Sequence, residues 1–206
     1  MVPLGVDLDA VDKYTSEKKV SIASLLAASY GFMQASCNGE QAAVVLSIYN
    51  ARDDSRYTHT FGALYRHYPL CLKWTSDMSA DDFIRKTQEN IMKCRVHTLY
   101  EPDPVPLDAA FAYQGENDVY LDFCGDSAIY EEIGDYEKEE FDFFIYRRED
   151  DLYCNLTYNS LRYSDKFVSD FLLDYKNVIH AFISGTAPSD IRNTVKSNAL
   201  MEGNKW

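Results

Sequence analysis

The sequence has no segment that would anchor the chain in a membrane or direct its export. No apolar run approaches the roughly 20 residues that a bilayer-spanning helix requires. Residues 1–5 do not form a basic start followed by a long apolar run, so we expect no signal peptide. Membrane proteins and secreted proteins are therefore not the expected classes.

Cysteines are few and widely spaced. None of the five lies at metal-ligand spacing from another, and an odd number in a chain of 206 residues is not a disulfide framework. We therefore predict that the chain holds no metal ion and works in a reducing, cytoplasmic compartment. The five are Cys37, Cys71, Cys94, Cys124 and Cys154.

Positive charge is also scarce. Lysine and arginine number 20 against 33 aspartate and glutamate residues, which gives a formal net charge of -13. A nucleic-acid-binding surface needs a basic face to displace counterions from phosphates, so we predict no nucleic-acid partner. The same charge argues against an anionic membrane surface, and its simplest consequence is solubility.

Several catalytic patterns are missing. The sequence has no Gly-rich phosphate loop and no Gly-x-Ser-x-Gly nucleophile turn. The four histidines are never adjacent, and they have no metal-ligand spacing. They are His59, His67, His97 and His180.

The composition is that of a globular protein with many aromatic residues. Hydrophobic residues make up 46% and charged residues 26%, and the length suits one domain or one lobe of a larger domain. Sixteen tyrosines and eleven phenylalanines predict a large aromatic core. They also allow a second interpretation, in which another domain normally covers part of the surface.

Four helices are expected from apolar spacing and capping residues. Residues 7–19 place apolar side chains near one face, and residues 22–33 are apolar almost all round and should be buried. Residues 83–97 and 165–182 carry amphipathic stripes. The last three helices follow serines that can cap them, namely Ser21, Ser79 and Ser164.

The expected strands are short apolar runs. They cover residues 44–49, 70–74, 109–113 and 119–123, and a β-hairpin is formed by residues 141–146 and 152–158. Pro69 should mark the beginning of the second strand, because proline is tolerated at a strand's first residue. Together these elements predict an α/β fold with a mixed β-sheet and helices packed on it.

The segment 61–71 reads Phe-Gly-Ala-Leu-Tyr-Arg-His-Tyr-Pro-Leu-Cys. It resembles a motif of the condensation domains of nonribosomal peptide synthetases, which is close to Ile-Gly-x-Phe-Val-Asn-Thr-x-Pro-Leu-Arg. Gly62, Pro69 and Leu70 match this motif. Arg66 and His67 stand where the family has Asn-Thr, and Cys71 replaces its final arginine, so the match is partial.

The order of elements over residues 7–190 strengthens this resemblance. A short helix, a buried Ala-rich helix and a strand open the second lobe of that family, and a strand pair, an acid-capped helix and a proline-containing linker close it. The resemblance implies one lobe of the chloramphenicol-acetyltransferase-like fold. It assigns residues 1–186 to the C-terminal lobe and residues 187–206 to a linker toward a following adenylation domain.

The family's catalytic motif, His-His-x-x-x-Asp-Gly, belongs to its first lobe and is absent from this sequence. The resemblance therefore implies half of a domain that joins carrier-bound aminoacyl or peptidyl thioesters through an amide bond, with no catalytic residue in this half and no activity alone. Its implied partners are the N-terminal lobe, peptidyl carrier proteins and an adenylation domain. It binds no cofactor directly, and the phosphopantetheine arm of a carrier would lie between the lobes.

Arg52 is the main candidate site residue. The resemblance implies that its guanidinium forms a salt bridge to the aspartate of the missing catalytic motif, a role that suits a permanently charged, bidentate donor. The alternative is a strand-end arginine paired with Asp53 or Asp54. Asn50, Gly62 and His67 are the candidates for lining the lobe interface or tunnel.

Two alternatives remain open for the chain as a whole, and one for its acidic stretch. The chain could be a lobe of another acyltransferase of the same superfamily, or a non-catalytic module that binds carrier proteins or neighbouring domains. The non-catalytic module is favoured by the departures at Arg66, His67 and Cys71, and by the segment that begins at His97, where the family has a His-Gln-x-x-Pro-Phe-Glu motif. The acidic stretch 131–140 is either a solvated loop or part of the segment that crosses to the other lobe.

Overall fold

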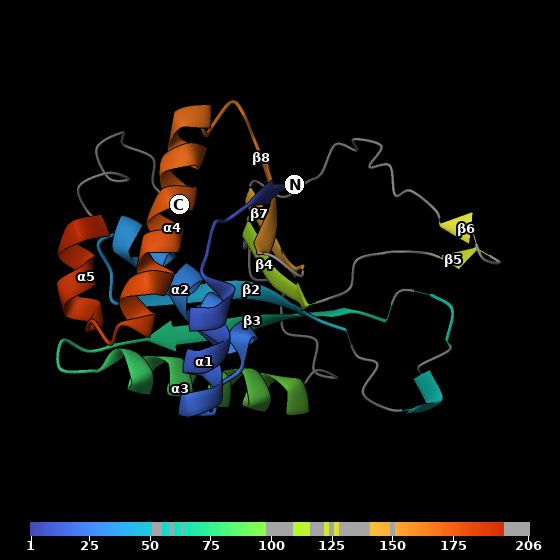
Figure 1. The fold of residues 1–206 in the computed structure, drawn as a ribbon, viewed down its shortest axis with the longest axis horizontal. Helices are drawn as coiled ribbons and strands as arrows, with labels where there is room; N and C mark the ends of the chain where they lie inside the picture. Colours follow the sequence, from blue (N-terminus) through green and yellow to red (C-terminus); the bar gives the residue numbers. More distant parts are fainter. Residues whose placement is uncertain are drawn as a thin grey trace.

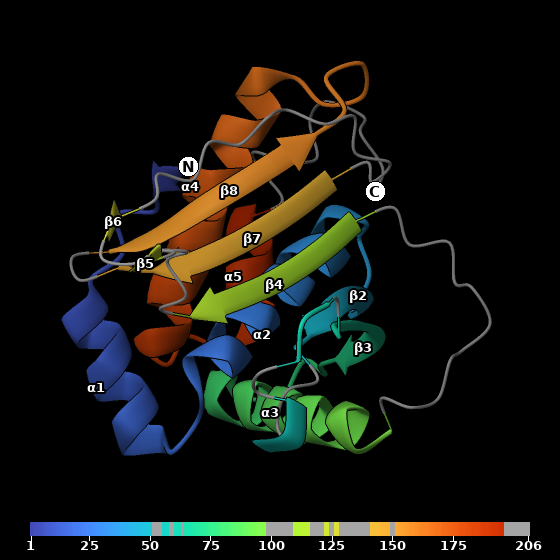
Figure 2. The same cartoon turned by 90° about the vertical axis from the view of Figure 1, so that its right-hand side faces the viewer.

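The computed structural model describes residues 1–50, 55–57, 60–62, 64–97, 109–115, 122–123, 126–127, 141–148 and 151–195. These residues form a six-stranded sheet, and helices cover one of its faces (Figure 1 and Figure 2). In Figure 2 the strands lie in front of the helix layer.

The sheet is mixed, and its strand order is β1-β8-β7-β4-β2-β3. The pairs β2–β4 and β4–β7 are parallel, and the other pairs are antiparallel. This arrangement confirms the predicted α/β fold and the predicted hairpin, which is formed by β7 and β8. The strands are β1 (Val2–Pro3), β2 (Ala42–Tyr49), β3 (Arg66–Lys73), β4 (Ala109–Gly115), β7 (Phe141–Arg147) and β8 (Leu152–Tyr158).

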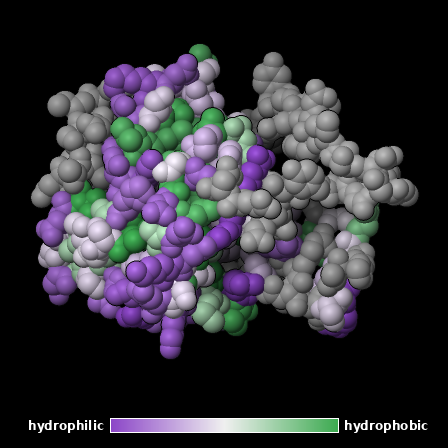
Figure 3. Space-filling model, in the orientation of Figure 1, coloured by the Kyte–Doolittle hydropathy of each residue, from purple (hydrophilic) through white to green (hydrophobic). Residues whose placement is uncertain are grey.

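The predicted helices are present, and the side chain at each N-cap accepts a hydrogen bond from a backbone N–H of the first turn. The four N-caps are Asp7, Ser21, Ser79 and Ser164. Hydrophilic side chains cover the outer face of the first helix (Figure 3), as its amphipathic pattern requires. The helices are α1 (Leu8–Lys18), α2 (Ile22–Cys37), α3 (Ala80–Val96), α4 (Asp165–Ile183) and α5 (Pro188–Val195), with a short 3-10 turn, η1 (Ser55–Tyr57).

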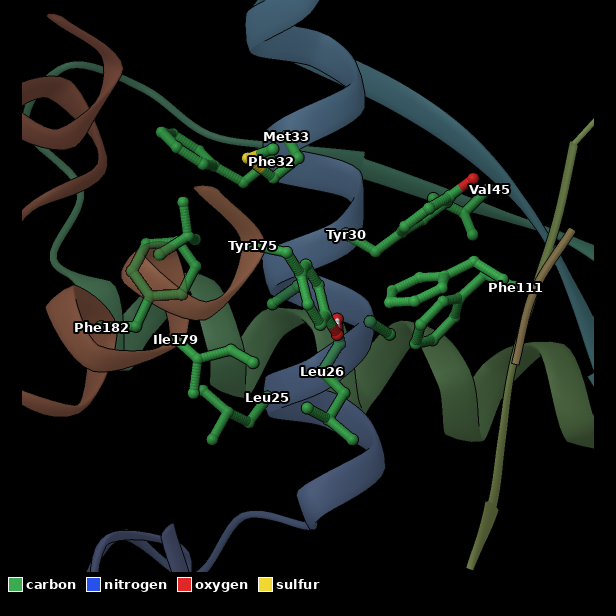
Figure 4. Packing of buried hydrophobic residues seen from close by; sticks show 14 of the residues in the cluster. Leu25, Leu26, Tyr30, Phe32, Met33, Val45, Phe111, Tyr175, Ile179 and Phe182 are labelled. Atoms are coloured by element: carbon green, nitrogen blue, oxygen red, sulfur yellow. Dashed lines mark hydrogen bonds between the residues drawn. The ribbon is translucent and has the colours of Figure 1, made fainter. Parts of the chain in front are cut away.

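Helix α2 lies at the centre of the core, and 13 of its 16 residues are buried. The ring of Tyr30 stacks on Phe111 of β4 with 4.8 Å between centroids, and Figure 4 shows both rings beside α2. The hydroxyl of Tyr175, on α4, donates a hydrogen bond of 2.9 Å to the carbonyl of Leu26. These contacts join α2 to the sheet on one side and to α4 on the other.

The prediction that the second strand begins at Pro69 is wrong. Strand β3 begins at Arg66, and Pro69 lies within it opposite Leu46. The proline is tolerated because β3 is an edge strand. Its carbonyl faces away from the sheet, where the thiol of Cys94 on α3 lies 3.8 Å from it. The missing N–H of Pro69 therefore costs the sheet no hydrogen bond.

Two other expectations fall partly outside the described residues. Of the predicted strand 119–123, the structure describes β5 (Asp122–Phe123), which pairs with β6 (Asp126–Ser127) as a separate two-stranded sheet. Of the predicted linker 187–206, the structure describes residues 187–195, where α5 packs on the lobe with Ile191 buried. The domain boundary itself stays a prediction.

Within the described ranges, no single helix has the length and apolarity needed to cross a membrane. Helices α1 and α2 pass that test only when taken together, with a bend of 104° between them.

Candidate functional site

The candidate site lies at the edge of the sheet where the parallel strands β2, β4 and β7 end. Ligands commonly bind at the carboxyl ends of parallel strands. Strand β3, which is antiparallel to β2, begins at this edge, so Tyr49 lies opposite Arg66 and Ile48 lies opposite His67. The sheet therefore brings together the predicted site residues that flank the β2–β3 connection.

Each predicted site residue has a different place relative to this edge. Asn50 is the first residue after β2 and is exposed. His67 is exposed on β3, and its ring lies edge-on to Tyr65 with 5.4 Å between centroids. Gly62 is exposed on the connection between the two strands. Arg52 lies outside the described residues, so its predicted role stays a prediction.

Gly62 has a backbone conformation that favours glycine. Its φ angle is +128°, and no atom lies within 4 Å of the place where a Cβ would be. The glycine is therefore favoured by backbone conformation and not by lack of space. This is a physical reason for a glycine at the position that matches the family motif.

Side-chain alternation divides the site between the two faces of the sheet. A Cβ at Gly31 on α2 would lie 3.3 Å from Val45 of β2, so Val45 faces the helices. Tyr49, four residues further along β2, lies on the same face. Its cross-strand neighbour Arg66 also lies on the helix-covered face, whereas His67 lies on the opposite face.

Residues that the sequence analysis missed lie on the helix-covered face. The guanidinium carbon of Arg95, near the end of α3, lies 4.9 Å from the centre of the Tyr49 ring. On the same face, Ser47 of β2 and Tyr68 of β3 lie opposite each other, and both side chains are buried. Burial raises the pKa of Tyr68, while the nearby Ser47 side chain and the Arg95 charge act in the opposite direction. No sequence signal joins α3 to β2, because their contact depends on the fold.

Exposed apolar side chains lie on the β2–β3 connection and on the last turns of α3. Phe61 is fully exposed, and more than half of the Tyr65 surface is exposed. Met92 and Val96 on α3 are also exposed. Exposed apolar side chains near a site are candidates for contact with a partner. The arrangement can therefore present aromatic, apolar and basic groups to a partner.

A shallow pocket of about 300 Å³ lies at the other end of β2 and β3, between these strands and α3. The predicted site residues do not line it. Its walls are formed by Ala42, Ala43, Val44, Cys71, Leu72, Lys73, Lys86 and Asn90. Among the residues that the structure describes, no three His, Cys, Asp or Glu side chains are grouped as a metal ion would require.

Comparison with solved structures identifies the fold, whereas the sequence comparisons give no match. No protein-family model matches the sequence, and no curated protein matches it. The condensation domain of the monacolin K polyketide synthase MokA has the same fold, with a TM-score of 0.73 and 15% identity over 88% of this chain and 46% of that chain.

Two further solved structures are similar. A four-domain nonribosomal peptide synthetase bound to AMP and glycine gives a TM-score of 0.73 and 10% identity, over 88% of this chain and 16% of that chain. The epimerization domain from the third module of tyrocidine synthetase B gives a TM-score of 0.64 and 18% identity, over 87% of this chain and 46% of that chain.

The chain therefore has the fold of one lobe of a condensation domain, as the motif at 61–71 and the order of elements predicted. It spans less than half the length of each of these solved chains. At these identities the likeness shows the fold, and the reaction is a separate question.

Proposed function

We propose that this chain is the C-terminal lobe of a condensation-type domain, which joins carrier-bound aminoacyl or peptidyl groups through an amide bond. The observation that carries the proposal is the match of 88% of this chain to 46% of a condensation domain. The sequence has no His-His-x-x-x-Asp-Gly motif. The proposed lobe is therefore inactive without a second lobe that supplies it.

In this proposal the carboxyl end of β2 faces the second lobe. Arg52 pairs with the aspartate of the catalytic motif, because a guanidinium binds a carboxylate at two points and never loses its charge. Asn50, Gly62 and His67 line the space between the lobes, where the phosphopantetheine arm of a carrier protein lies. The exposure of all three supports this placement.

The remaining proposed partners follow from the same architecture. The N-terminal lobe covers the exposed apolar side chains of Phe61 and Tyr65, which would otherwise face water. Peptidyl carrier proteins deliver the two thioesters, and an adenylation domain follows residues 187–206. A cytoplasmic location is consistent with this chemistry.

The proposal is tested by measuring amide formation in the full-length protein with two aminoacyl carrier proteins. Arg52→Ala should lower kcat by about tenfold or more, since an interaction made at the reacting centre is lost. Arg52→Lys should recover little, because an ammonium does not reproduce the two-point contact. Arg56→Ala is the matched control, because Arg56 lies on the same connection with its guanidinium beside the Tyr57 ring.

Two results would contradict the proposal. Wild-type protein that forms no amide with any carrier pair would exclude the reaction. Equal activities of the Arg52→Ala and Arg56→Ala variants would exclude the supporting role of Arg52. The 206-residue chain assayed alone should be inactive.

A non-catalytic module that binds carrier proteins is the second candidate. Arg66, His67 and Cys71 replace motif residues of the condensation family, and all three are exposed. A full-length protein that binds carriers but releases neither amide nor ester would support this candidate. Release of an ester product would instead indicate another acyltransferase with the same fold. The fold also occurs in an epimerization domain. The same assay should therefore measure whether the configuration at the α-carbon of the carrier-bound residue changes.

A further inference from the structure

We infer that Arg95 is a positioning residue that holds the carboxyl end of β2 in place. The inference rests on the proposed function, because the end of β2 carries Asn50 and leads to Arg52. Neither Arg95 nor its partner Tyr49 belongs to the motif at 61–71. The contact between them joins the last turns of α3 to the site.

The contact is a cation–π interaction. The guanidinium carbon of Arg95 lies 4.9 Å from the centre of the Tyr49 ring, within the roughly 6 Å over which such attraction acts. Tyr49 is the last residue of β2 and is half-buried against the core. Its ring is therefore held between the sheet and α3, one residue before Asn50.

The second half of α3 also contacts β3 within the described residues. The side-chain amide of Asn90 donates a hydrogen bond of 2.9 Å to the carbonyl of Cys71. The thiol of Cys94 lies 3.8 Å from the carbonyl of Pro69. These two contacts join α3 to the outer edge of β3. Arg95 joins the same helix to Tyr49 at the end of β2.

The first half of α3 is anchored in the core, so the helix can act as a fixed support. The ring of Phe83 is buried and lies edge-on to Trp74 and to Phe182, with 5.6 and 6.0 Å between centroids. The backbone near the far end of such a helix therefore has a defined position. Through its contact with the Tyr49 ring, Arg95 can set the position of Tyr49 and of Asn50 next to it.

The proposed effect acts through position and not through contact with substrate. Catalysis is sensitive to displacements of about 1 Å in a supporting group, and an exposed cation–π contact is strong enough to change the population of a strand end severalfold. Removal of Arg95 should therefore lower kcat through the placement of Asn50. The Michaelis constant should change little, since neither Arg95 nor Tyr49 is among the residues proposed to line the space for the phosphopantetheine arm.

The test uses amide formation by the full-length protein. Arg95→Ala and Tyr49→Leu should each lower kcat about three- to tenfold with KM unchanged, and the double variant should be no worse than either, as expected for two halves of one contact. Arg95→Lys and Tyr49→Phe should retain most activity, because they keep a cation and a ring.

Arg85→Ala is the matched control. Arg85 is an exposed arginine on the same helix, and its guanidinium lies 3.1 Å from Asp82 on the same helix. An equal loss of kcat in Arg85→Ala and Arg95→Ala would overturn the inference, because it would show a general effect of charge or helix stability. An unchanged kcat in Arg95→Ala, with Arg52→Ala impaired, would overturn the inference and leave the proposed function intact.

A second measurement does not depend on activity. In the ¹⁵N–¹H spectrum of the 206-residue chain, the backbone and side-chain amides of Asn50 should shift in Arg95→Ala and stay in place in Arg85→Ala. Unshifted Asn50 signals would overturn the inference even if the enzyme assay fails. Shifted signals in a protein that forms no amide would support the positioning contact and contradict the proposed reaction.

Discussion

The guanidinium of Arg147, the last residue of β7, forms a two-point contact with the carboxylate of Asp12 on α1. The Nη1–Oδ1 and Nη2–Oδ2 distances are 2.7 and 2.6 Å. These hydrogen bonds lower the pKa of Asp12 from its ordinary value of 3.8; partial burial opposes them, and the charge of Arg147 adds to them. The contact joins the first helix to the carboxyl end of β7.

Replacement of Asp12 by asparagine should lower the free energy of unfolding by about 0.5–1 kcal/mol at pH 7, a value kept small because the carboxylate is partly exposed. The folded-state pKa is lowered, so the stabilisation is fully present above pH 3.8. It is lost as the pH falls through the folded-state pKa. Urea unfolding of wild type and variant across pH 3–7 should show the two curves converging at the acid end.

Glu17→Gln is the control for this prediction. Glu17 is an exposed acid on the same helix, so its replacement should change the stability by no more than about 0.5 kcal/mol. If Asp12→Asn costs no more than Glu17→Gln, or if its cost persists at low pH, the ion pair does not stabilise the lobe.

Gly31 sets how closely α2 approaches the sheet. A Cβ at this position would overlap the Cδ1 atom of Leu72 and lie 3.3 Å from Val45. Both neighbours are buried. Gly31→Val should therefore lower the free energy of unfolding by about 2 kcal/mol through overpacking, measured by urea denaturation. Ala23→Val, at a half-buried position of the same helix, should cost less than half as much. Equal costs would contradict the packing explanation, because helix propensity favours valine over glycine at position 31 and alanine over valine at position 23.

Sequence reasoning predicted the helices well because their signals are local. Ser21, Ser79 and Ser164 each cap the helix that follows them. The apolar character of residues 22–33 correctly indicated the buried helix, because a helix that is apolar on every face is stable only inside the core. The family resemblance then ordered these elements into a lobe, which the structural comparisons confirm for the fold.

The errors and omissions have non-local causes. Pro69 was expected at a strand's start, because the sequence does not show that β3 is an edge strand whose outer side tolerates a missing N–H. The contact between Tyr49 and Arg95 was missed because it requires α3 to pack beside the end of β2. His67 and Arg66 are neighbours in sequence, yet alternation along β3 places them on opposite faces of the sheet.

Tyr175 supplies a buried hydrogen bond that a phenylalanine would lack. Its side chain is fully buried, and its hydroxyl donates to the carbonyl of Leu26 at 2.9 Å. Tyr175→Phe should cost about 1 kcal/mol in urea unfolding, because the ring contacts remain and one bond is lost. Tyr158→Phe removes an exposed hydroxyl bonded to Asp165 and should cost less than about 0.5 kcal/mol. A Tyr175→Phe variant with the wild-type free energy of unfolding would mean that the buried hydrogen bond makes no net contribution to stability.

Cys154 and Cys71 should differ sharply in reactivity. Burial raises the pKa of the Cys154 thiol to about 11, and its side chain is fully buried in β8. At pH 8 only about one thiol in a thousand is then ionised, and the thiolate is the reactive form. Cys71 is exposed on the edge strand β3. Iodoacetamide at pH 8, followed by mass spectrometry of the peptides, should label Cys71 at least about a hundredfold faster.

Urea should remove this difference, because unfolding exposes Cys154 and returns its pKa to the ordinary range. Cys71→Ser should abolish the fast labelling of its own peptide and leave the slow rate at Cys154 unchanged. The slow rate should also follow the unfolding equilibrium, since labelling of a buried thiol requires the lobe to open. Equal labelling of Cys71 and Cys154 in native buffer would mean that reagent reaches β8 without unfolding, which contradicts the burial of Cys154 in the core.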